Sequence, residues 1–349
     1  MKYQIGLIGC GGIAGTWIQA VAQHPDCRIA LTYDIADEAA RQRATEVGGQ
    51  AVPSVEALLA GAIDLVIIGT PTPSHPDLVM EAARAGKHIL CEKPMALNLD
   101  LCRTMTQVCQ EAGVKLAIGH SLRFWDAFLA CRRLVGEGAI GVPVSGSIDR
   151  MGTAATAHRR DDESQPDHWR HHAVHSGGHV LEGFIHELDF ARAIFGEVES
   201  VSCQIAGGRD YDGILSPQIS QALVGFTGGA LATLRTGATV AMPTRGYWLG
   251  GTEGGLRFSE WGGPVEHFVH GRDQPQIITP QSQSAYYLEL CDLLNAIEED
   301  GEPENSPLNG MKNIALGLGM YWSFETGQRV QYQNGLPVDM AGDYQNTQW

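Results

Sequence analysis

The chain has 349 residues, of which 44% are hydrophobic and 18% charged, an ordinary globular balance that excludes wholesale disorder. Its net charge of −16, from 24 Lys and Arg against 40 Asp and Glu, argues against a nucleic acid held by the overall field. No apolar run approaches the roughly 18 residues that span a bilayer, and the opening stretch is too short and glycine-rich for a signal peptide. We therefore expect a soluble protein with no membrane partner.

The first 120 residues alternate short apolar runs with amphipathic segments of helical length. The apolar runs lack polar alternation, as strands buried on both faces should. They cover residues 3–8, 28–33, 64–69, 87–91 and 114–119, and the helical segments cover 12–23, 36–47, 74–86 and 98–112. This order predicts right-handed βαβ crossovers and a doubly wound parallel sheet, in an α/β domain over residues 1–122.

After residue 123 the pattern changes to longer strands in which polar and apolar residues alternate. Residues 218–226 show this alternation, which favours an antiparallel or mixed sheet with one less buried face. Helices are expected near 124–137, 177–195, 282–299 and 308–326, and strands at 142–151, 197–206, 217–227, 230–240, 246–251 and 254–260. We therefore expect an α+β domain over residues 123–349, whose final helices can pack back on the first domain.

A glycine-rich turn lies between the first strand and the first helix. Residues 9–14 read Gly-Cys-Gly-Gly-Ile-Ala, a G-x-G-x-x-A pattern. Gly9 permits the tight turn, and Gly11 lets the backbone approach a pyrophosphate. The N–H groups that follow, those of Gly12 and Ile13, open a helix whose dipole favours the phosphates. The pattern predicts a dinucleotide-binding Rossmann domain.

The nucleotide is expected to be NAD. Asp34 ends the second strand 20 residues after Ala14, where a carboxylate accepts hydrogen bonds from a ribose 2′-hydroxyl and repels a 2′-phosphate. The next residue is Ile35, and Arg41 and Arg43 follow too far along the helix to reverse the preference for NAD over NADP. The alternative is an incidental Asp after a glycine-rich turn of another α/β fold.

Further stretches resemble the Gfo/Idh/MocA family of oxidoreductases, and the resemblance covers nearly the whole chain. Residues 67–75 read IIGTPTPSH, and residues 86–94 read GKHILCEKP. Residues 176–190 read SGGHVLEGFIHELDF, and residues 119–125 read GHSLRFW, which is similar to the family's link between domains. The resemblance implies a Rossmann domain followed by a substrate domain with a large open sheet. Such a sheet commonly mediates oligomerisation, so we expect a homodimer or homotetramer.

The same resemblance assigns roles to residues that follow the fourth and fifth strands. The residues expected to line the cofactor there are Thr70, Pro71, Thr72, His75, Glu92 and Lys93. Lys93 matches the family's catalytic lysine, near the nicotinamide. The physical reason is that an ammonium beside a carbonyl oxygen stabilises the charge that develops as a hydride arrives or leaves. A surface lysine at a strand end is the alternative.

Glu182 and His186 lie four residues apart in the helix expected over 177–195, so the pattern places them on one face. His186 is expected to take the proton of a substrate hydroxyl, because imidazole titrates near neutral pH. Glu182 is expected to orient it or to hold a neighbouring hydroxyl. Many family members have Asp at this position, and the longer Glu leaves the division of roles open. A core histidine with a capping carboxylate is the alternative, and Asp189 is expected to be structural.

Seven of the 13 histidines lie between residues 158 and 186, in a segment that also carries arginines and a tryptophan. Such side chains can bind hydroxyls or an anionic group and stack on a sugar ring. The residues expected to bind the substrate are Lys93, Arg123, Trp125, His158, Arg159, Trp169, Arg170, Glu182 and His186. A solvated loop is the alternative.

A metal site in this segment is the less favoured interpretation. His171, His175 and His179 would align on one helical face and so provide three ligands. Gly177 and Gly178 interrupt that helix, and the family's chemistry needs no metal. We therefore expect none.

Eight cysteines are scattered along the chain, with no CxxC pair and no zinc spacing. Several lie in apolar segments, where cysteine behaves as a small hydrophobic residue. This usage predicts a reducing, cytoplasmic compartment.

These features predict an NAD-dependent oxidoreductase that moves a hydride between the nicotinamide and a ring hydroxyl or ketone of a sugar, sugar derivative or polyol. In this prediction His186 takes the hydroxyl proton and Lys93 polarises the nascent carbonyl. One alternative is an NAD-dependent glycosidase that oxidises its substrate transiently, eliminates the aglycone and regenerates NAD. Another is a non-catalytic NAD or ligand sensor on the same fold.

Overall fold

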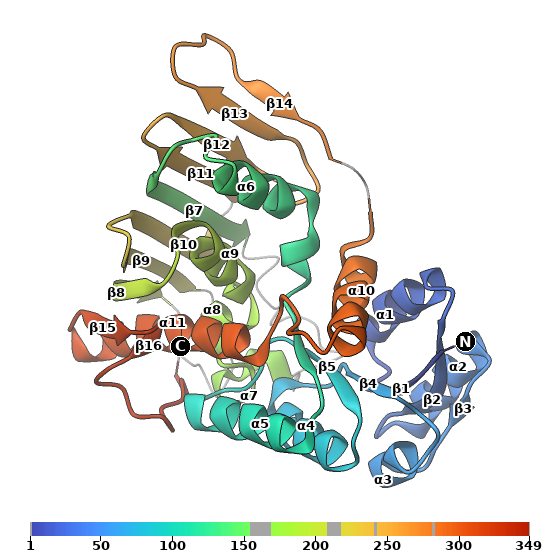
Figure 1. Cartoon of the computed structure of the whole chain (residues 1–349). Helices are drawn as coiled ribbons and strands as arrows, with labels where there is room; N and C mark the ends of the chain where they lie inside the picture. The colour runs from blue at the N-terminus through green and yellow to red at the C-terminus, as the bar shows by residue number, and fades with distance from the viewer. Residues whose placement is uncertain (1, 154–168, 208–217, 241–242, 281–282, 349) are drawn as a thin grey trace. The chain divides into compact units, whose positions relative to one another are not determined.

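The computed structural model describes residues 2–153, 169–207, 218–240, 243–280 and 283–348 of the chain (Figure 1). Contacts between residues divide the chain into two compact units, each made of two segments. Unit 1 comprises Met1–Phe124 and Gln283–Met311, and unit 2 comprises Trp125–Ser282 and Lys312–Trp349. The first division falls two residues beyond the expected boundary at residue 122, and residues 283–311 belong to the first unit.

Unit 1 contains a six-stranded parallel sheet in the order β3-β2-β1-β4-β5-β6. Its strands are β1 (Tyr3–Ile8), β2 (Cys27–Tyr33), β3 (Gln50–Ala51), β4 (Leu65–Ile68), β5 (His88–Glu92) and β6 (Leu116–Gly119). Its helices are α1 (Gly12–Gln23), α2 (Asp37–Val47), α3 (Val55–Leu59), α4 (His75–Arg84), α5 (Leu99–Ala112) and α10 (Ala285–Glu298), with the 3-10 turns η1 (Thr72–Ser74) and η2 (Ser121–Phe124). This strand order is that of a Rossmann sheet, which confirms the predicted fold class.

Burial explains why the sequence predicts most of this unit. Every residue of β4 is buried, so the strand is an unbroken apolar run. α1 and α10 pack with the central strands in one core cluster that includes Ile5, Trp17 and Leu293. β3 and α3 are absent from the prediction, because elements of two and five residues are too short to show a period.

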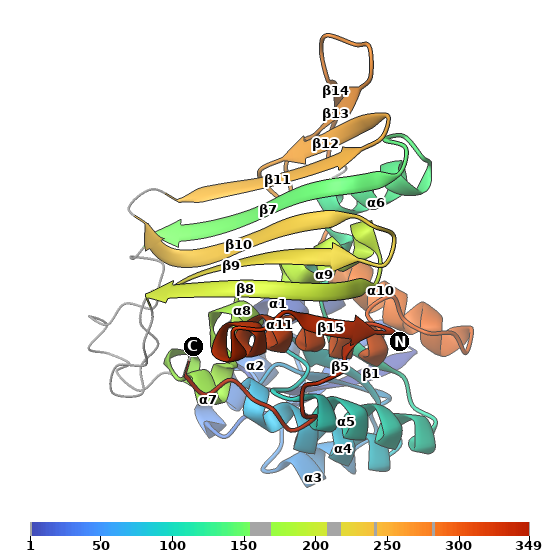
Figure 2. The same ribbon diagram turned by 90° about the vertical axis from the view of Figure 1, so that its left-hand side faces the viewer.

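Unit 2 contains a ten-stranded sheet in the order β14-β13-β12-β11-β7-β10-β9-β8-β15-β16, most of which Figure 2 shows side by side. Its strands are β7 (Pro143–Thr153), β8 (Val198–Gly207), β9 (Gln218–Phe226), β10 (Leu231–Val240), β11 (Thr244–Gly251), β12 (Gly254–Phe258), β13 (Val265–Val269), β14 (Gln276–Ile278), β15 (Val330–Gln333) and β16 (Leu336–Pro337). β7 and β10 run parallel and the other paired strands run antiparallel, which confirms a large, mainly antiparallel sheet.

The helices of unit 2 range from short turns of four or five residues to helices of 11 residues. They are α6 (Asp126–Gly136), α7 (Ala173–Ser176), α8 (Gly178–Glu182) and α9 (Ile185–Phe195), with the 3-10 turn η3 (Trp169–His171). α11 (Pro307–Thr326) begins in unit 1 and continues in unit 2. None of the helices in the described ranges is long and apolar enough to cross a membrane.

The two faces of the ten-stranded sheet differ in burial. On one face Tyr247 is fully buried, and Phe190 of α9 meets it edge-on with ring centroids 6.2 Å apart. On the other face Leu223 and Trp248 are 49% and 45% exposed. α9 therefore covers one face, and apolar side chains on the opposite face remain accessible within this chain.

Candidate active site

The glycine-rich turn after β1 leaves open space at the start of α1. Gly9 has a φ of +90°, and a Cβ there would lie 2.7 Å from the carbonyl carbon of Gly69, so only glycine fits. A Cβ at Gly11 or Gly12 would meet no atom within 4 Å. α1 begins at Gly12 with a glycine as its N-cap, so its first N–H groups, including that of Ile13, can bind an anion.

Asp34 lies against this turn at the end of β2. Its Oδ2 accepts a hydrogen bond of 2.7 Å from the N–H of Cys10, and its Oδ1 accepts one of 2.8 Å from the N–H of Ala36. Two backbone donors therefore fix the carboxylate where a Rossmann fold binds a ribose hydroxyl. Ile35, the next residue, is 93% exposed.

Arg43 reaches back to the same turn from α2. Its Nη2 donates to the carbonyl oxygen of Gly11 at 3.3 Å and its Nε to that of Cys10 at 3.4 Å, while its Nη1 pairs with Glu46 at 2.7 Å. The long side chain of Arg43 therefore brings a cation back to the turn from its position along α2. Arg41 instead makes exposed ion pairs within α2.

His75 connects the loop after β4 to the loop after β5. Its ring is fully buried, with Nε2 2.9 Å from the carbonyl oxygen of Thr70 and Nδ1 2.8 Å from that of Pro94. The hydroxyl of Thr72 is also buried and has no hydrogen-bond partner among the residues that the structure describes. A bound ligand can satisfy such a group. The contacts of His75 thus hold the segment of Thr70, Pro71 and Thr72 at the carboxyl end of β4.

Glu92 and Lys93 lie where β5 ends. Oε1 of the buried Glu92 accepts a hydrogen bond of 2.9 Å from the indole Nε1 of Trp17, and Oε2 accepts one of 3.2 Å from the backbone N–H of Lys93. Trp17 lies in α1, and its ring meets Tyr286 of α10 edge-on with centroids 5.0 Å apart. The carboxylate that precedes Lys93 is thus held by the helix that starts at the glycine-rich turn.

Unit 1 therefore has the features that a dinucleotide requires. Open space beside the glycine-rich turn suits a pyrophosphate, the fixed Asp34 carboxylate suits a ribose hydroxyl, and the Thr72 hydroxyl offers a further polar contact. The residues expected to bind the cofactor all lie in this unit, at or just after the carboxyl ends of β1, β2, β4 and β5: Gly9, Gly11, Gly12, Ile13, Asp34, Thr70, Pro71, Thr72, His75, Glu92 and Lys93. These residues fit NAD.

Three of the expected substrate residues form one cluster in unit 2. Oε1 of Glu182 accepts a hydrogen bond of 2.7 Å from Nε of Arg170. The Arg170 guanidinium also lies over the ring of Trp169, 4.4 Å from its centroid. A charged pair next to an aromatic face can bind the hydroxyls and the apolar side of a sugar ring.

Glu182 and His186 do not share one continuous helix, which corrects the prediction of a helix over 177–195. α8 ends at Glu182 and α9 begins at Ile185, with Gly183 and Phe184 between them. A Cβ at Gly183 would lie only 3.2 Å from a carbonyl oxygen of the preceding turn, so glycine suits this junction. Glu182 and His186 therefore belong to different helices and share no single helical face.

The remaining expected substrate residues have separate places. Arg123 is buried within unit 1, where it donates to Oε2 of Glu304 at 3.3 Å and to Oδ1 of Asn309 at 3.0 Å. Trp125 is partly exposed and directly precedes α6 in unit 2. His158 and Arg159 lie outside the described residues.

The histidines considered as metal ligands are divided between short helices. Gly177, with a φ of +76°, separates α7 from α8, so His175 and His179 belong to different helices. Nε2 of His179 lies 2.7 Å from Oγ1 of Thr236. Across the described ranges, no three His, Cys, Asp or Glu side chains group as metal ligands.

Asp189 has a structural environment. It is buried, and its Oδ1 accepts a hydrogen bond of 2.8 Å from Nδ2 of Asn313. Oδ1 of Asn313 in turn accepts one of 2.5 Å from Nη1 of Arg192. These contacts connect α9 to α11.

The sequence does not identify several residues that contact the candidate site residues from distant elements. Trp17 is a large aromatic residue in a helix of mainly small side chains, a signal that predicts burial but not its bond to Glu92, 75 residues away. Arg150 is a charged residue in a strand, a signal that a buried ionic partner is required. Arg43 offers no comparable signal.

Comparison with known proteins agrees with this geometry. Residues 3–120 match a family model described as an oxidoreductase family with an NAD-binding Rossmann fold. Residues 128–257 match the model of the GFO/IDH/MocA C-terminal domain. The two models together cover well over half of the chain.

Similar proteins act on carbohydrates. The chain is 29% identical to a 1,5-anhydro-D-fructose reductase of Ensifer adhaerens, over 95% of this chain and 99% of the relative. It is 29% identical to a 2,7-anhydro-N-acetylneuraminate hydratase of Escherichia coli (strain K12), over 76% of this chain and 72% of the relative. A levoglucosan dehydrogenase, solved with NADH and levoglucosan, shares the fold with a TM-score of 0.86 at 20% identity, over 95% of this chain and 99% of that one.

Proposed function

The chain belongs to the Gfo/Idh/MocA family of oxidoreductases, and we propose that it moves a hydride between NAD and a ring hydroxyl or ketone of a sugar, sugar derivative or polyol. The observation that carries this proposal is the Glu92–Lys93 segment. It places a lysine directly after a buried carboxylate that accepts two hydrogen bonds, in the same Rossmann unit as the glycine-rich turn and Asp34. The reductase of Ensifer adhaerens supports the substrate class.

The chain's own residues are proposed to handle the proton and the developing charge. NAD, when bound, supplies the hydride acceptor. Nζ of Lys93 donates a hydrogen bond to the oxygen of the reacting carbon and stabilises the carbonyl as it forms. His186 takes the hydroxyl proton and returns it in the reductive direction. Glu182, paired with Arg170, holds a neighbouring hydroxyl.

Two substitutions test these roles separately from cofactor binding. We expect Lys93→Met and His186→Ala to lower kcat by at least about 100-fold, the loss typical for a group that donates or accepts a proton or stabilises charge. NADH binding, followed by its fluorescence, should persist in His186→Ala, and in Lys93→Met it should weaken far less than kcat falls, because the other expected cofactor residues are unchanged. Lys115→Met is the matched control, because Lys115 of the same unit pairs with the exposed Asp300. Turnover of Lys93→Met at the level of this control would contradict the proposal.

We further propose that the enzyme prefers NAD to NADP. The support is the Asp34 carboxylate, which two backbone amides fix at the end of β2 and which would repel a 2′-phosphate. Arg43 lies beside the same turn, but its Nη1 is already paired with Glu46.

The hydratase of Escherichia coli among the relatives supports a second candidate reaction for this chain. Oxidation of one carbinol to a ketone makes the neighbouring C–H acidic, so a base can remove that proton. The leaving group then departs from the next carbon as its alcohol, water adds in its place, and the hydride returns to the ketone. NAD is unchanged overall. Consumption of a glycoside without accumulated NADH would favour this reaction, and stoichiometric NADH would exclude it for that substrate.

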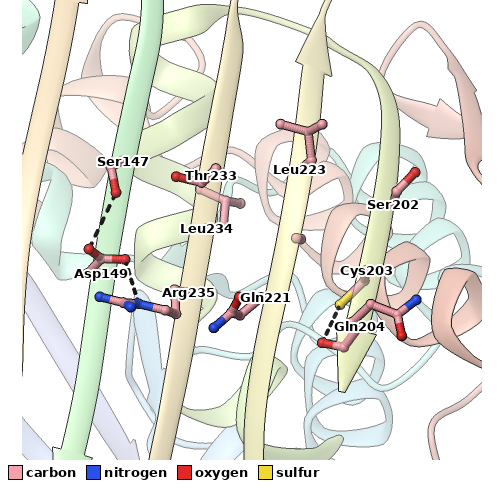
Figure 3. A pocket seen from close by; sticks show the side chains of 11 residues that line it. Ser147, Asp149, Ser202, Cys203, Gln204, Gln221, Leu223, Thr233, Leu234 and Arg235 are labelled. Carbon is pink, nitrogen blue, oxygen red and sulfur yellow. Dashed lines mark hydrogen bonds and ion pairs between the residues drawn. The ribbon is translucent and has the colours of Figure 1, made fainter. Parts of the chain in front are cut away.

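We propose that a second copy of the chain covers the accessible face of the ten-stranded sheet, in a homodimer or homotetramer. Figure 3 shows part of this face, where Arg235 of β10 pairs with Asp149 of β7 at 3.1 Å. The side chains that line it are Ser147, Asp149, Ser202, Gln204, Gln221, Leu223, Thr233 and Arg235. Because these two charges are neutralised within the face, two identical faces can pack without strong repulsion.

The oligomer is tested by charging this face. We expect the double variant Leu223→Arg, Trp248→Arg to sediment with half the mass of the wild-type oligomer in analytical ultracentrifugation, because both side chains are about half exposed on the sheet. Leu308→Arg is the control, since Leu308 is equally exposed but lies in α11. A double variant that sediments like the wild type would contradict this interface.

We infer a reducing, cytoplasmic location. All eight cysteines are free thiols, and seven of them are buried. When the cells are lysed and the protein is unfolded in the presence of an alkylating reagent, mass spectrometry should find all eight thiols modified. Any disulfide among them would contradict this location.

A further inference from the structure

A guanidinium from the sheet closes the gap between α8 and α9. In a continuous helix the carbonyl oxygen of Gly183 would accept the N–H of Glu187. Here the N–H of Glu187 donates instead to the carbonyl oxygen of Phe184, at 3.0 Å. Nη1 of Arg150, which lies on β7, donates to the carbonyl oxygen of Gly183 at 2.5 Å. The side chain thus replaces a helical hydrogen bond at the break.

The same Arg150 nitrogen is held by a buried acid on the next turn. Oε2 of Glu187 lies 3.2 Å from Nη1 of Arg150, and the hydroxyl of Tyr247 donates to Oε1 of Glu187 at 2.9 Å. Glu187 has no exposed surface, so its charge depends on these partners. Burial, followed by the negative charge of Glu187, raises the pKa of Tyr247, so its hydroxyl remains a donor. Three elements, β7, α9 and β11, thus meet at one ion pair.

The contacts of Arg150 flank both residues to which the proposed function assigns roles in unit 2. Gly183 directly follows Glu182, and Glu187 directly follows His186. We propose that Arg150, supported by Glu187 and Tyr247, is a positioning residue that sets the orientation of Glu182 relative to His186 across the helix break. This inference rests on the proposed function for the roles of those two residues, but the positioning itself is a property of unit 2.

Three substitutions separate the contacts of this group. Arg150→Met removes the hydrogen bonds of Arg150 to Gly183 and Glu187, Arg150→Lys keeps the charge and a donor, and Tyr247→Phe removes only the hydroxyl. Arg257→Met is the matched control, because Arg257 of the same sheet pairs with Glu266 on the exposed side. Each variant is measured by hydrogen exchange of the amides of residues 183–187, by kcat and KM, and by NADH binding.

We expect Arg150→Met to speed exchange at residues 183–187 and to lower kcat at least about tenfold, since small displacements of positioned groups cost this much or more. The KM for NAD and NADH binding should be unchanged, because the proposed cofactor residues lie in unit 1. Arg150→Lys should restore part of both losses, and Tyr247→Phe should produce a smaller effect in the same direction. The control should behave as the wild type.

The proposal is overturned if Arg150→Met exchanges the amides of residues 183–187 at the wild-type rate and has the wild-type kcat. A fall in its melting temperature alone would not rescue the proposal. If Arg150→Met does not fold, Tyr247→Phe decides the outcome, and unchanged exchange in that variant overturns the proposal. If the wild type oxidises no sugar, sugar derivative or polyol, the proposed function fails. The exchange measurement then still decides whether Arg150 positions the break.

Discussion

The indole Nε1 of Trp17 donates a hydrogen bond of 2.9 Å to Oε1 of Glu92, and both side chains are buried. Trp17 lies in the helix that begins at the glycine-rich turn, and Glu92 directly precedes Lys93. The other oxygen of Glu92 accepts the N–H of Lys93 at 3.2 Å. One carboxylate therefore connects the proposed pyrophosphate helix to the backbone of the proposed catalytic lysine.

Trp17→Phe tests this connection, because it keeps an aromatic contact to Tyr286 but removes the donor. We expect it to lower the free energy of unfolding by about 1.5–3 kcal/mol, the usual contribution of a hydrogen bond to a charged group, and to lower kcat. Urea denaturation and steady-state kinetics measure both. Trp322→Phe is the control, since that ring meets Tyr344 in unit 2. Equal losses of kcat in the two variants would refute the connection.

Cofactor preference should change when the acid at the end of β2 is removed. Asp34→Ser eliminates the repulsion of a 2′-phosphate and leaves the Arg43 guanidinium beside the turn. We expect kcat/KM for NAD to fall at least about tenfold, because a hydrogen bond to a charged group is lost. We expect kcat/KM for NADP to rise, because the repulsion of the 2′-phosphate is removed. Adding Arg43→Gln should cancel the gain for NADP. An unchanged ratio of the two kcat/KM values in Asp34→Ser would rule out this role for the carboxylate.

Stability should decline in alkaline solution because thiols are buried. Burial raises the pKa of Cys102 to about 12, and burial together with Asp34 raises that of Cys10 to about 11. The unfolded chain loses these protons near pH 8.5, whereas the folded chain keeps them, so stability present below about pH 8.5 is lost as pH rises toward the folded values. Each such thiol steepens the decline by up to about 1.4 kcal/mol per pH unit.

Urea denaturation at pH 8, 9 and 10 measures this decline. Cys102→Ala removes one titrating group, so its free energy of unfolding should fall less steeply between about pH 9 and 10 than that of the wild type. Parallel curves for the two proteins would show that the Cys102 thiol titrates alike in the folded and unfolded states.

The C-terminal segment should stabilise the turn that leads into α8. Nδ2 of the buried Asn346 donates to the carbonyl oxygen of Gly177 at 3.1 Å. We expect Asn346→Ala to cost about 1–3 kcal/mol in the free energy of unfolding, because a buried hydrogen bond is lost. Gln345→Ala is the control, because the exposed side-chain amide of Gln345 donates to the carbonyl oxygen of Val174. We expect this variant to change the free energy of unfolding by no more than about 0.5 kcal/mol. Equal costs in urea denaturation would show that burial of the amide is irrelevant.

The sequence predicts the fold well where burial is uniform. β4 is an unbroken, fully buried apolar run, the strands beside it are mostly buried, and α1 and α5 agree with the expected segments within one residue at each end. The strands β13 to β16 are absent from the prediction, because runs of five residues or fewer are too short to establish a period. The break between α8 and α9 leaves the helical period nearly intact, and only Gly183 signals it.

The site is predictable where chemistry follows a local motif. The glycine-rich turn, Asp34 and Lys93 all lie at strand ends that the sequence identifies. The contacts of Trp17 and Arg150 join residues far apart in the chain, and no local pattern encodes which carboxylate they meet. Long-range partners of this kind depend on packing, which a single sequence does not specify.

The most direct test of the central claim is to follow reduced nicotinamide by absorbance while the purified protein is incubated with NAD and a panel of free sugars, sugar acids, inositols and glycosides. We expect NADH in stoichiometric amounts with at least one free sugar or polyol, formed at least about 100-fold more slowly by Lys93→Met. Release of sugar from a glycoside that requires NAD but accumulates no NADH would contradict the central claim in favour of the transient-oxidation reaction. NADH formation by Lys93→Met at the wild-type rate would contradict the proposed chemistry altogether.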